Sequence, residues 1–189
     1  RAWKGMQAGD TLMIYDGTYT ETIQPLVAGK PGAPVTIKAV NDGKVIVDGR
    51  GVDIPLKLGD TWPGDNRSYI TVEGIVVKNG TEATVRIRGD HMILRRVSAY
   101  DAALRMNSSV IAVVWSNDIL LEDVVAAGTG RKSILIFTSE RVTVRRAFTQ
   151  WEAWDGMTAD TCAMGWPAGN GINPYNSKNV TIENAIVTG

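Results

Sequence analysis

The sequence lacks the features that mark several large classes of protein. It has a single cysteine, Cys162, in 189 residues, so no internal disulfide can form and a thiolate zinc site has no second ligand. Its 20 basic and 20 acidic side chains cancel to a formal charge of zero, which argues against a protein that wraps nucleic acid. The longest apolar runs, such as residues 110–115, are far shorter than the roughly 20 residues that span a bilayer. We therefore expect no nucleic-acid partner and no membrane partner.

Apolar residues are nevertheless plentiful, at 44% of the chain, and 21% of the residues are charged. This balance suits one folded domain with a core and argues against intrinsic disorder.

Six nine-residue units align without gaps. They are Gly32–Val40, Arg67–Ile75, Gly89–Val97, Ser116–Val124, Ser139–Ala147 and Ser177–Ala185. Apolar residues fill the fourth, sixth and ninth positions of every unit. Apolar residues two apart indicate one face of a strand, and the later apolar position indicates a bend that returns the chain to the core.

The spacing of these units predicts a solenoid. The closest starts, Arg67 and Gly89, leave room for about three short strands and their turns. Turn-forming residues recur after the units, at Asn79, Asp101, Gly128 and Gly189. We predict a parallel β-solenoid in which each coil buries its apolar face by stacking on the next.

The seventh position of the units carries charges that alternate in sign. It reads Lys38, Glu73, Arg95, Glu122, Arg145 and Glu183. If the units stack in register, each outward charge lies between two opposite ones, which cross-strand pairing favours. We interpret the row as a structural charge ladder that fixes the register of the coils, in preference to a groove for polyanions.

The first fifty residues carry a family resemblance, in residues 9–19, 32–39 and 43–49. They resemble the opening coils of the pectate-lyase-like superfamily, and most closely those of alginate-lyase and chondroitinase-B type polysaccharide lyases. The resemblance implies an all-β fold, a single right-handed parallel β-helix of about six or more coils, with a short N-terminal cap helix over residues 2–7. It also implies a calcium cluster of Asn and Glu and a catalytic Lys and Arg pair, and neither is matched here. Enzymatic activity therefore stays open, and we expect no cofactor, because no motif supports calcium.

A long Trp-rich excursion, residues 149–174, is the best candidate for a functional loop. Its candidate substrate-binding residues are Trp151, Glu152, Trp154, Asp155, Asp160 and Trp166. The indoles could stack on sugar rings, and the carboxylates could accept sugar hydroxyls or form an acid and base pair. The alternative is that the indoles fold back on the solenoid as an apolar cluster or pack against a neighbouring subunit.

Other polar residues give weaker evidence for a functional site. Residues 51–66 form an oxygen-rich stretch that fits no regular calcium loop, and solvated turns are the preferred interpretation. His91, the single histidine, lies at a turn-edge position. Four sites satisfy the rule for N-glycosylation, at Asn66, Asn79, Asn107 and Asn179. Asn179 would be a poor acceptor, because it lies within a strand unit.

Two functions remain open. The first is an extracellular or cell-surface protein that binds a polysaccharide and resembles polysaccharide lyases. The second is a non-catalytic structural protein, such as a surface fibre, filament subunit or adhesin, that assembles through its solenoid ends or the Trp-rich loop. We expect residues 1–189 to form one β-helix domain, part of a longer solenoid or joined to a neighbour at its C-terminal end.

Overall fold

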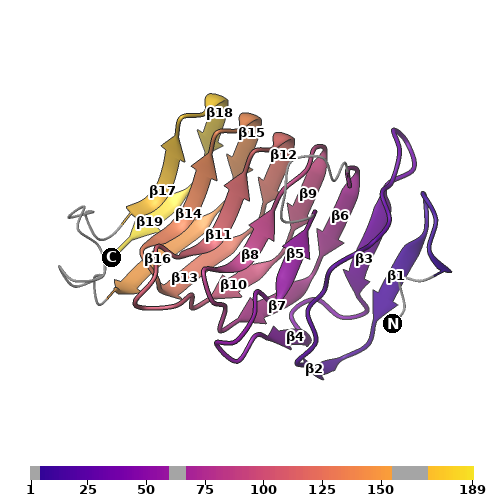
Figure 1. Cartoon of the computed structure of the whole chain (residues 1–189), viewed down its shortest axis with the longest axis horizontal. Coiled ribbons are helices and arrows are strands. Elements are labelled where there is room, and N and C mark those ends of the chain that lie inside the picture. Colours follow the sequence, from indigo (N-terminus) through magenta and orange to yellow (C-terminus); the bar gives the residue numbers. More distant parts are fainter. Residues whose placement is uncertain (1–4, 60–66, 155–169) are drawn as a thin grey trace.

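The chain folds as a parallel β-helix. The computed structural model describes residues 5–59, 67–154 and 170–189, which form strands and no α-helix. Figure 1 shows the coils stacked along one axis, with the N-terminal and C-terminal coils at opposite ends. The predicted fold class is confirmed. Of the expected cap helix, residues 2–4 lie outside the described residues, Gly5 has 3₁₀ geometry, and Met6 and Gln7 are in no helix.

The strands form three parallel sheets, here named A, B and C, in which each strand pairs with its equivalents in adjacent coils. Sheet A contains β1 (Thr11–Ile14), β3 (Val35–Ala39), β6 (Ile70–Glu73), β9 (Met92–Arg95), β12 (Asn117–Glu122), β15 (Glu140–Arg145) and β18 (Lys178–Glu183). Sheet B contains β2 (Gly17–Tyr19), β4 (Val45–Asp48), β7 (Ile75–Lys78), β10 (Ser98–Tyr100), β13 (Val125–Thr129), β16 (Phe148–Ala153) and β19 (Ile186–Thr188). Sheet C contains β5 (Leu56–Leu58), β8 (Ala83–Ile87), β11 (Ser109–Val114), β14 (Lys132–Phe137) and β17 (Asn170–Tyr175).

The six sequence units supply six of the seven strands of sheet A. Their fourth and sixth positions face the interior, where most of these side chains are fully buried. The first strand of the sheet, β1, was not recognised as a unit, yet it pairs in register with β3. One apolar position was wrong: Val40 is exposed and Ala39 before it is buried, because β3 runs on through Ala39 and its alternation continues.

Residues whose φ and ψ angles lie in the left-handed region turn the chain at the corners between sheets. The predicted turn residues Asn79, Asp101 and Gly128 have φ values of 57°, 57° and 95°. Asn79 and Asp101 directly follow β7 and β10, and Gly128 lies at the equivalent position near the end of β13. Glycine, Asn and Asp tolerate this conformation better than other residues. At Gly128 the packing also requires glycine, because a Cβ atom there would lie 2.2 Å from Oδ1 of Asp101.

Both proposed excursions are shorter than the sequence indicated. Strand β16 continues through Ala153 and β17 begins at Asn170, so both ends of the 149–174 segment belong to the coil. The 51–66 segment likewise contains β5, and the Lys57 and Asp53 side chains within it form an ion pair at 2.6 Å. Residues 60–66, including Asn66, lie outside the described residues.

Candidate functional site

Two of the predicted tryptophans fold back onto the two preceding coils. Trp151 lies in β16, and its Nε1 donates a hydrogen bond to the carbonyl oxygen of Gly130 at 2.8 Å. Trp154 follows β16, and its Nε1 donates to the carbonyl oxygen of Met106 at 3.0 Å. Both indoles are half-buried, so they cover the corner between sheets B and C.

The remaining candidates of the Trp-rich loop are not brought together. Glu152 is exposed on β16. Asp155, Asp160 and Trp166 lie outside the described residues, as does Cys162. The predicted pair of carboxylates therefore stays a prediction.

Trp154 also contacts Arg131, which directly precedes β14 and its first residue, Lys132. The guanidinium carbon of Arg131 lies 5.7 Å from the centroid of the indole ring, within the range of a cation–π contact. Arg131 and Lys132 are 8% and 7% exposed. Basic side chains are rarely this buried unless other groups stabilise them.

Asn107 holds both cationic side chains. Its Oδ1 accepts hydrogen bonds from Nη1 of Arg131 at 2.7 Å and from Nζ of Lys132 at 2.9 Å. The buried hydroxyl of Ser108 links the same corner together: its Oγ accepts a hydrogen bond from the backbone amide of Arg131 at 3.2 Å and donates one to the carbonyl oxygen of Ala103 at 2.6 Å. We name Asn107, Arg131, Lys132 and Trp154 the Arg131–Lys132 site.

Lys132 has an unusually low pKa for a lysine. Burial lowers the pKa of its amine to about 8, and the neighbouring charge of Arg131 acts in the same direction. Among the described residues, Lys132 forms no ion pair with a carboxylate. A buried cation without a carboxylate partner favours an incoming anion, and a strongly shifted pKa is a common property of functional sites.

Arg131 and Lys132 were not predicted to be site residues, and Asn107 was predicted only as a possible glycosylation acceptor. A signal was present in β14, where Lys132, Ile134 and Ile136 share the alternating inward positions. A lysine in an inward register is informative only once the strand and its partners are known. The contact between Lys132 and Asn107 joins two coils, so it could not be derived from local sequence.

The charge ladder on sheet A lies in register. Its members pair as Lys38 with Glu73, Glu73 with Arg95, Arg95 with Glu122, Glu122 with Arg145 and Arg145 with Glu183. Glu122 is bound by Nε of Arg95, Nε of Arg145 and Nη2 of Arg146, each at 2.6 Å. Hydrogen bonds from Arg95 and Arg146 are the main reason that the pKa of Glu122 falls to about 2. The carboxylates and guanidinium groups of the ladder are therefore paired with one another.

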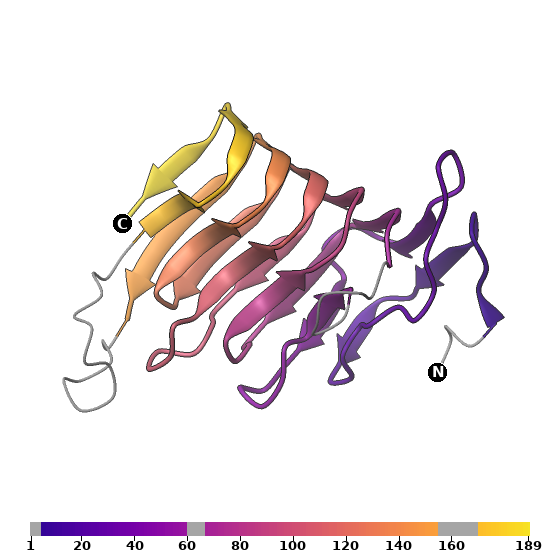
Figure 2. The same ribbon diagram turned by 45° about the horizontal axis from the view of Figure 1, so that its top comes forward.

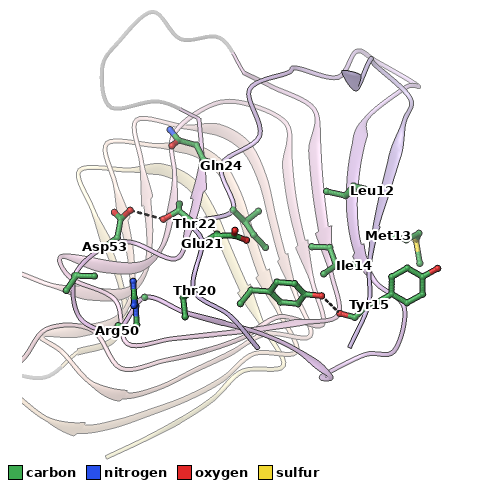
Figure 3. Close-up of a pocket in the computed structure, with 14 residues that line it drawn as sticks. Leu12, Met13, Ile14, Tyr15, Thr20, Glu21, Thr22, Gln24, Arg50 and Asp53 are labelled. Atoms are coloured by element: carbon green, nitrogen blue, oxygen red, sulfur yellow. Dashed lines mark hydrogen bonds between the residues drawn. The ribbon is translucent and has the colours of Figure 1, made fainter. Parts of the chain in front are cut away.

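A hollow with a volume of about 890 Å³ lies at the N-terminal end of the solenoid. Figure 3 shows Leu12 and Ile14 on one side and the segment from Thr20 to Gln24 on the other. Its carboxylate Asp53 accepts hydrogen bonds from Thr22 and Lys57, at 2.7 and 2.6 Å. In the described parts of the chain, no three His, Cys, Asp or Glu side chains are arranged to hold a metal ion. No helix there is long and apolar enough to cross a membrane.

The fold and its relatives define a class: a parallel β-helix of the polysaccharide-lyase type. The structure resembles a family 6 polysaccharide lyase specific for mannuronic acid, from human gut microbiota, with a TM-score of 0.58 and 15% identity over 97% of this chain and 49% of that one. It also resembles a PL6 family polysaccharide lyase from Pseudopedobacter saltans, with a TM-score of 0.57 and 15% identity over 99% of this chain and 50% of that one. A pectate lyase matches with a TM-score of 0.50 and 15% identity over 98% of this chain and 55% of that one.

The family model of chondroitinase B matches residues 1–112, more than half of the sequence. The chain therefore belongs to the chondroitinase B family, and the resemblance seen in its opening coils is confirmed. No curated protein sequence matches it. The chain spans about half the length of the lyases with similar structures. The family match ends before Arg131 and Lys132 and thus assigns them no role.

Proposed function

We propose that the chain binds an acidic polysaccharide at the Arg131–Lys132 site. The observation that carries this proposal is Lys132, which is 7% exposed, has a pKa near 8 and forms no ion pair with a described carboxylate. A sugar carboxylate would supply the missing negative charge. The half-buried indole of Trp154 offers a surface for a sugar ring beside it.

The choice of ligand follows from this chemistry and from the family. The similar structures include a lyase specific for mannuronic acid and a pectate lyase. Mannuronate and pectate share a pyranose ring with a carboxylate, which suits a cationic pair next to an aromatic ring. A uronic-acid polymer is therefore the proposed ligand class, and a secreted or cell-surface location follows from where such polymers occur.

Lys132 could also serve in lyase chemistry. In β-elimination, a base removes the proton next to the uronate carboxylate, the glycosidic C–O bond breaks as the double bond forms, and the leaving oxygen takes up a proton from solvent. A lysine with a pKa near 8 is partly neutral at mildly alkaline pH, so its amine can accept a proton. Binding to the protonated amine and catalysis by the neutral amine therefore predict opposite pH dependences.

The test is calorimetric titration of the protein with oligomannuronate and oligogalacturonate at pH 7 and at pH 9. We expect Lys132→Met to weaken binding at pH 7 at least tenfold, because the ammonium is lost. Lys178→Met is the matched control, since Lys178 is exposed on β18, and it should bind like the wild type.

Binding of the wild type should weaken as the pH rises through 8. Ultraviolet absorbance of the unsaturated product, followed with the same polymers, separates a lyase from a binding protein. Equal affinity of the wild type and Lys132→Met for every uronate tested would refute the proposed site.

A further inference from the structure

The side-chain amide of Asn107 is bound at its oxygen and open at its nitrogen. Its Oδ1 accepts hydrogen bonds from Nη1 of Arg131 at 2.7 Å and from Nζ of Lys132 at 2.9 Å. Its Nδ2 donates no hydrogen bond to the residues that the structure describes, and Asn107 is exposed in the turn before β11. Two cationic donors on a carbonyl oxygen stabilise the negative charge that develops there when a nucleophile adds to the carbonyl carbon. The fold therefore activates this amide for attack.

The nearest nucleophile along the chain is the backbone nitrogen of Ser108. A bond from this nitrogen to Cγ of Asn107 closes a five-membered ring. The Ser108 N–H donates to the carbonyl oxygen of Met106 at 2.7 Å, inside the same turn. Because β11 begins at Ser109, the attacking nitrogen takes part in no hydrogen bond of sheet C.

We propose that Asn107 is a site of spontaneous deamidation that closes the Arg131–Lys132 site. The backbone nitrogen of Ser108 loses its proton to solvent and bonds to Cγ of Asn107. The Cγ–Nδ2 bond breaks, and Nδ2 takes up a proton and leaves as ammonia. Water then opens the cyclic imide to aspartate or isoaspartate, so one water is consumed and one ammonia is released for each carboxylate formed.

The new carboxylate would lie beside the two cationic groups that now bind the amide oxygen. It gives the buried ammonium of Lys132 a counter-charge, which stabilises the product in the fold. It also supplies the negative charge that a sugar carboxylate would otherwise bring. The closing of the site therefore rests on the proposed function, whereas the modification itself depends only on the geometry around Asn107.

A second Asn–Ser pair provides an internal comparison. Asn176–Ser177 has the same local sequence, and Asn176 is also exposed. Its Nδ2 donates to Oγ1 of Thr138 at 3.3 Å, and its Oδ1 accepts no hydrogen bond from a described cationic side chain. Local sequence thus predicts equal rates of deamidation at the two asparagines, whereas the structure predicts a faster reaction at Asn107.

Asn79 provides the opposite case. Glycine follows it, and because glycine has no side chain to hinder ring closure, local sequence predicts a fast reaction here. In the fold, Nδ2 of Asn79 donates to Oδ1 of Asp48 at 2.9 Å, and the Gly80 amide donates to the carbonyl oxygen of Asp101 at 2.9 Å. The leaving group and the nucleophile are both held, so we expect the folded chain to protect Asn79.

The test is peptide mapping by mass spectrometry after prolonged incubation at pH 8, with the protein folded and, in parallel, unfolded in urea. In the folded protein, Asn107 should deamidate about tenfold or more faster than Asn176 and Asn79. In urea, Asn79 should become the fastest of the three, and Asn107 and Asn176 should react at similar rates. Lys132→Met should slow the reaction of folded Asn107 severalfold and leave Asn176 unchanged. Equal rates at Asn107 and Asn176 in the folded protein, or a rate at Asn107 that Lys132→Met does not alter, would overturn the proposal.

The effect on the site is measured with Asn107→Asp, which places the product carboxylate there. In calorimetric titration at pH 7, this variant should bind oligomannuronate and oligogalacturonate at least tenfold more weakly than the wild type, while Asn176→Asp should bind like the wild type. Unimpaired binding by Asn107→Asp would refute the closing of the site. If the wild type binds neither ligand, the proposed function and the closing of the site fail together, while mass spectrometry still decides whether Asn107 is modified.

Discussion

At the scale of single residues, Lys132 stands apart from the other basic groups of the chain. The arginines and lysines of sheet A are partly exposed and face carboxylates, whereas Lys132 is enclosed and bound to an amide oxygen. Its protonated form is therefore less stable in the folded state than in the unfolded state. Such a residue lowers stability, which is a common property of groups retained for binding or catalysis.

Lys132→Met should therefore stabilise the protein. The pKa of the amine falls from 10.5 in the unfolded chain to about 8 in the fold, so the unfolded state holds the proton more tightly. Wild-type stability should rise as the pH increases from about 8 to 10.5, and the variant should lack this rise. At pH 7 the gain should be about 1–3 kcal/mol, measured by urea unfolding. A variant less stable than the wild type would contradict the interpretation of Lys132 as an uncompensated buried cation.

At the scale of the strands, the alternating charges of sheet A hold adjacent coils in register. Glu122 on β12 is the central member, because it binds arginines from both neighbouring strands, Arg95 on β9 and Arg145 on β15. Its side chain is only 6% exposed, so these bonds are partly shielded from solvent. The row accordingly acts as a structural element more than as a binding surface for polyanions.

Glu122→Gln should lower the melting temperature at pH 7 by several degrees, because three guanidinium groups lose their shared counter-charge. The depressed pKa of the carboxyl means that its contribution is complete above about 4.5 and is lost as the pH falls toward 2. Thermal melts across this range should show a flatter acid limb for the variant. Glu183→Gln, at the end of the row, is the control and should have little effect. A variant as stable as the wild type at pH 7 would show that the ladder does not stabilise the coils.

At the scale of the whole molecule, the last coil described leaves apolar side chains uncovered. Ile182 on β18 and Val187 on β19 are 43% and 54% exposed, although the equivalent residues of the preceding coil, Val144 and Thr149, are buried. Ile186 on β19 is 61% exposed at a position that is half-buried in the preceding coil. Figure 2 shows these two strands at the C-terminal end of the stack. Their outer edges have no neighbouring strand in the described residues, and such edges favour association.

We therefore expect the 189-residue chain to self-associate through β18 and β19. Light scattering across a concentration series should show a mass that rises with concentration. Ile186→Lys places a charge on this end and should shift the protein toward monomer, while Leu104→Lys, on an exposed turn, should not. A monodisperse wild-type monomer at high micromolar concentration would contradict this expectation and the proposal of assembly through the solenoid ends.

Much of the fold was predictable because the sequence repeats a nine-residue unit. The apolar positions of the six units, the turn residues Asn79, Asp101 and Gly128, and the family resemblance each follow from local sequence. The misplaced Val40 and the overlong excursions arose because strand ends depend on pairing with neighbours, which short patterns do not encode. The unrecognised β1 has no full copy of the unit, and only its pairing with β3 reveals its place.

The sequence by itself determined that the coils stack, which strand faces point inward and that the charges alternate. Each of these features follows from the positions of apolar and charged residues within the repeated nine-residue unit. Only the tertiary structure decided which side chains meet across coils. Asn107 and Lys132 are 25 residues apart, and Tyr69 and His91 belong to different units, so their contacts depend on how the coils stack. The environment that lowers the pKa of Lys132 arises from that stacking, since burial is a property of the assembled solenoid and not of any one strand.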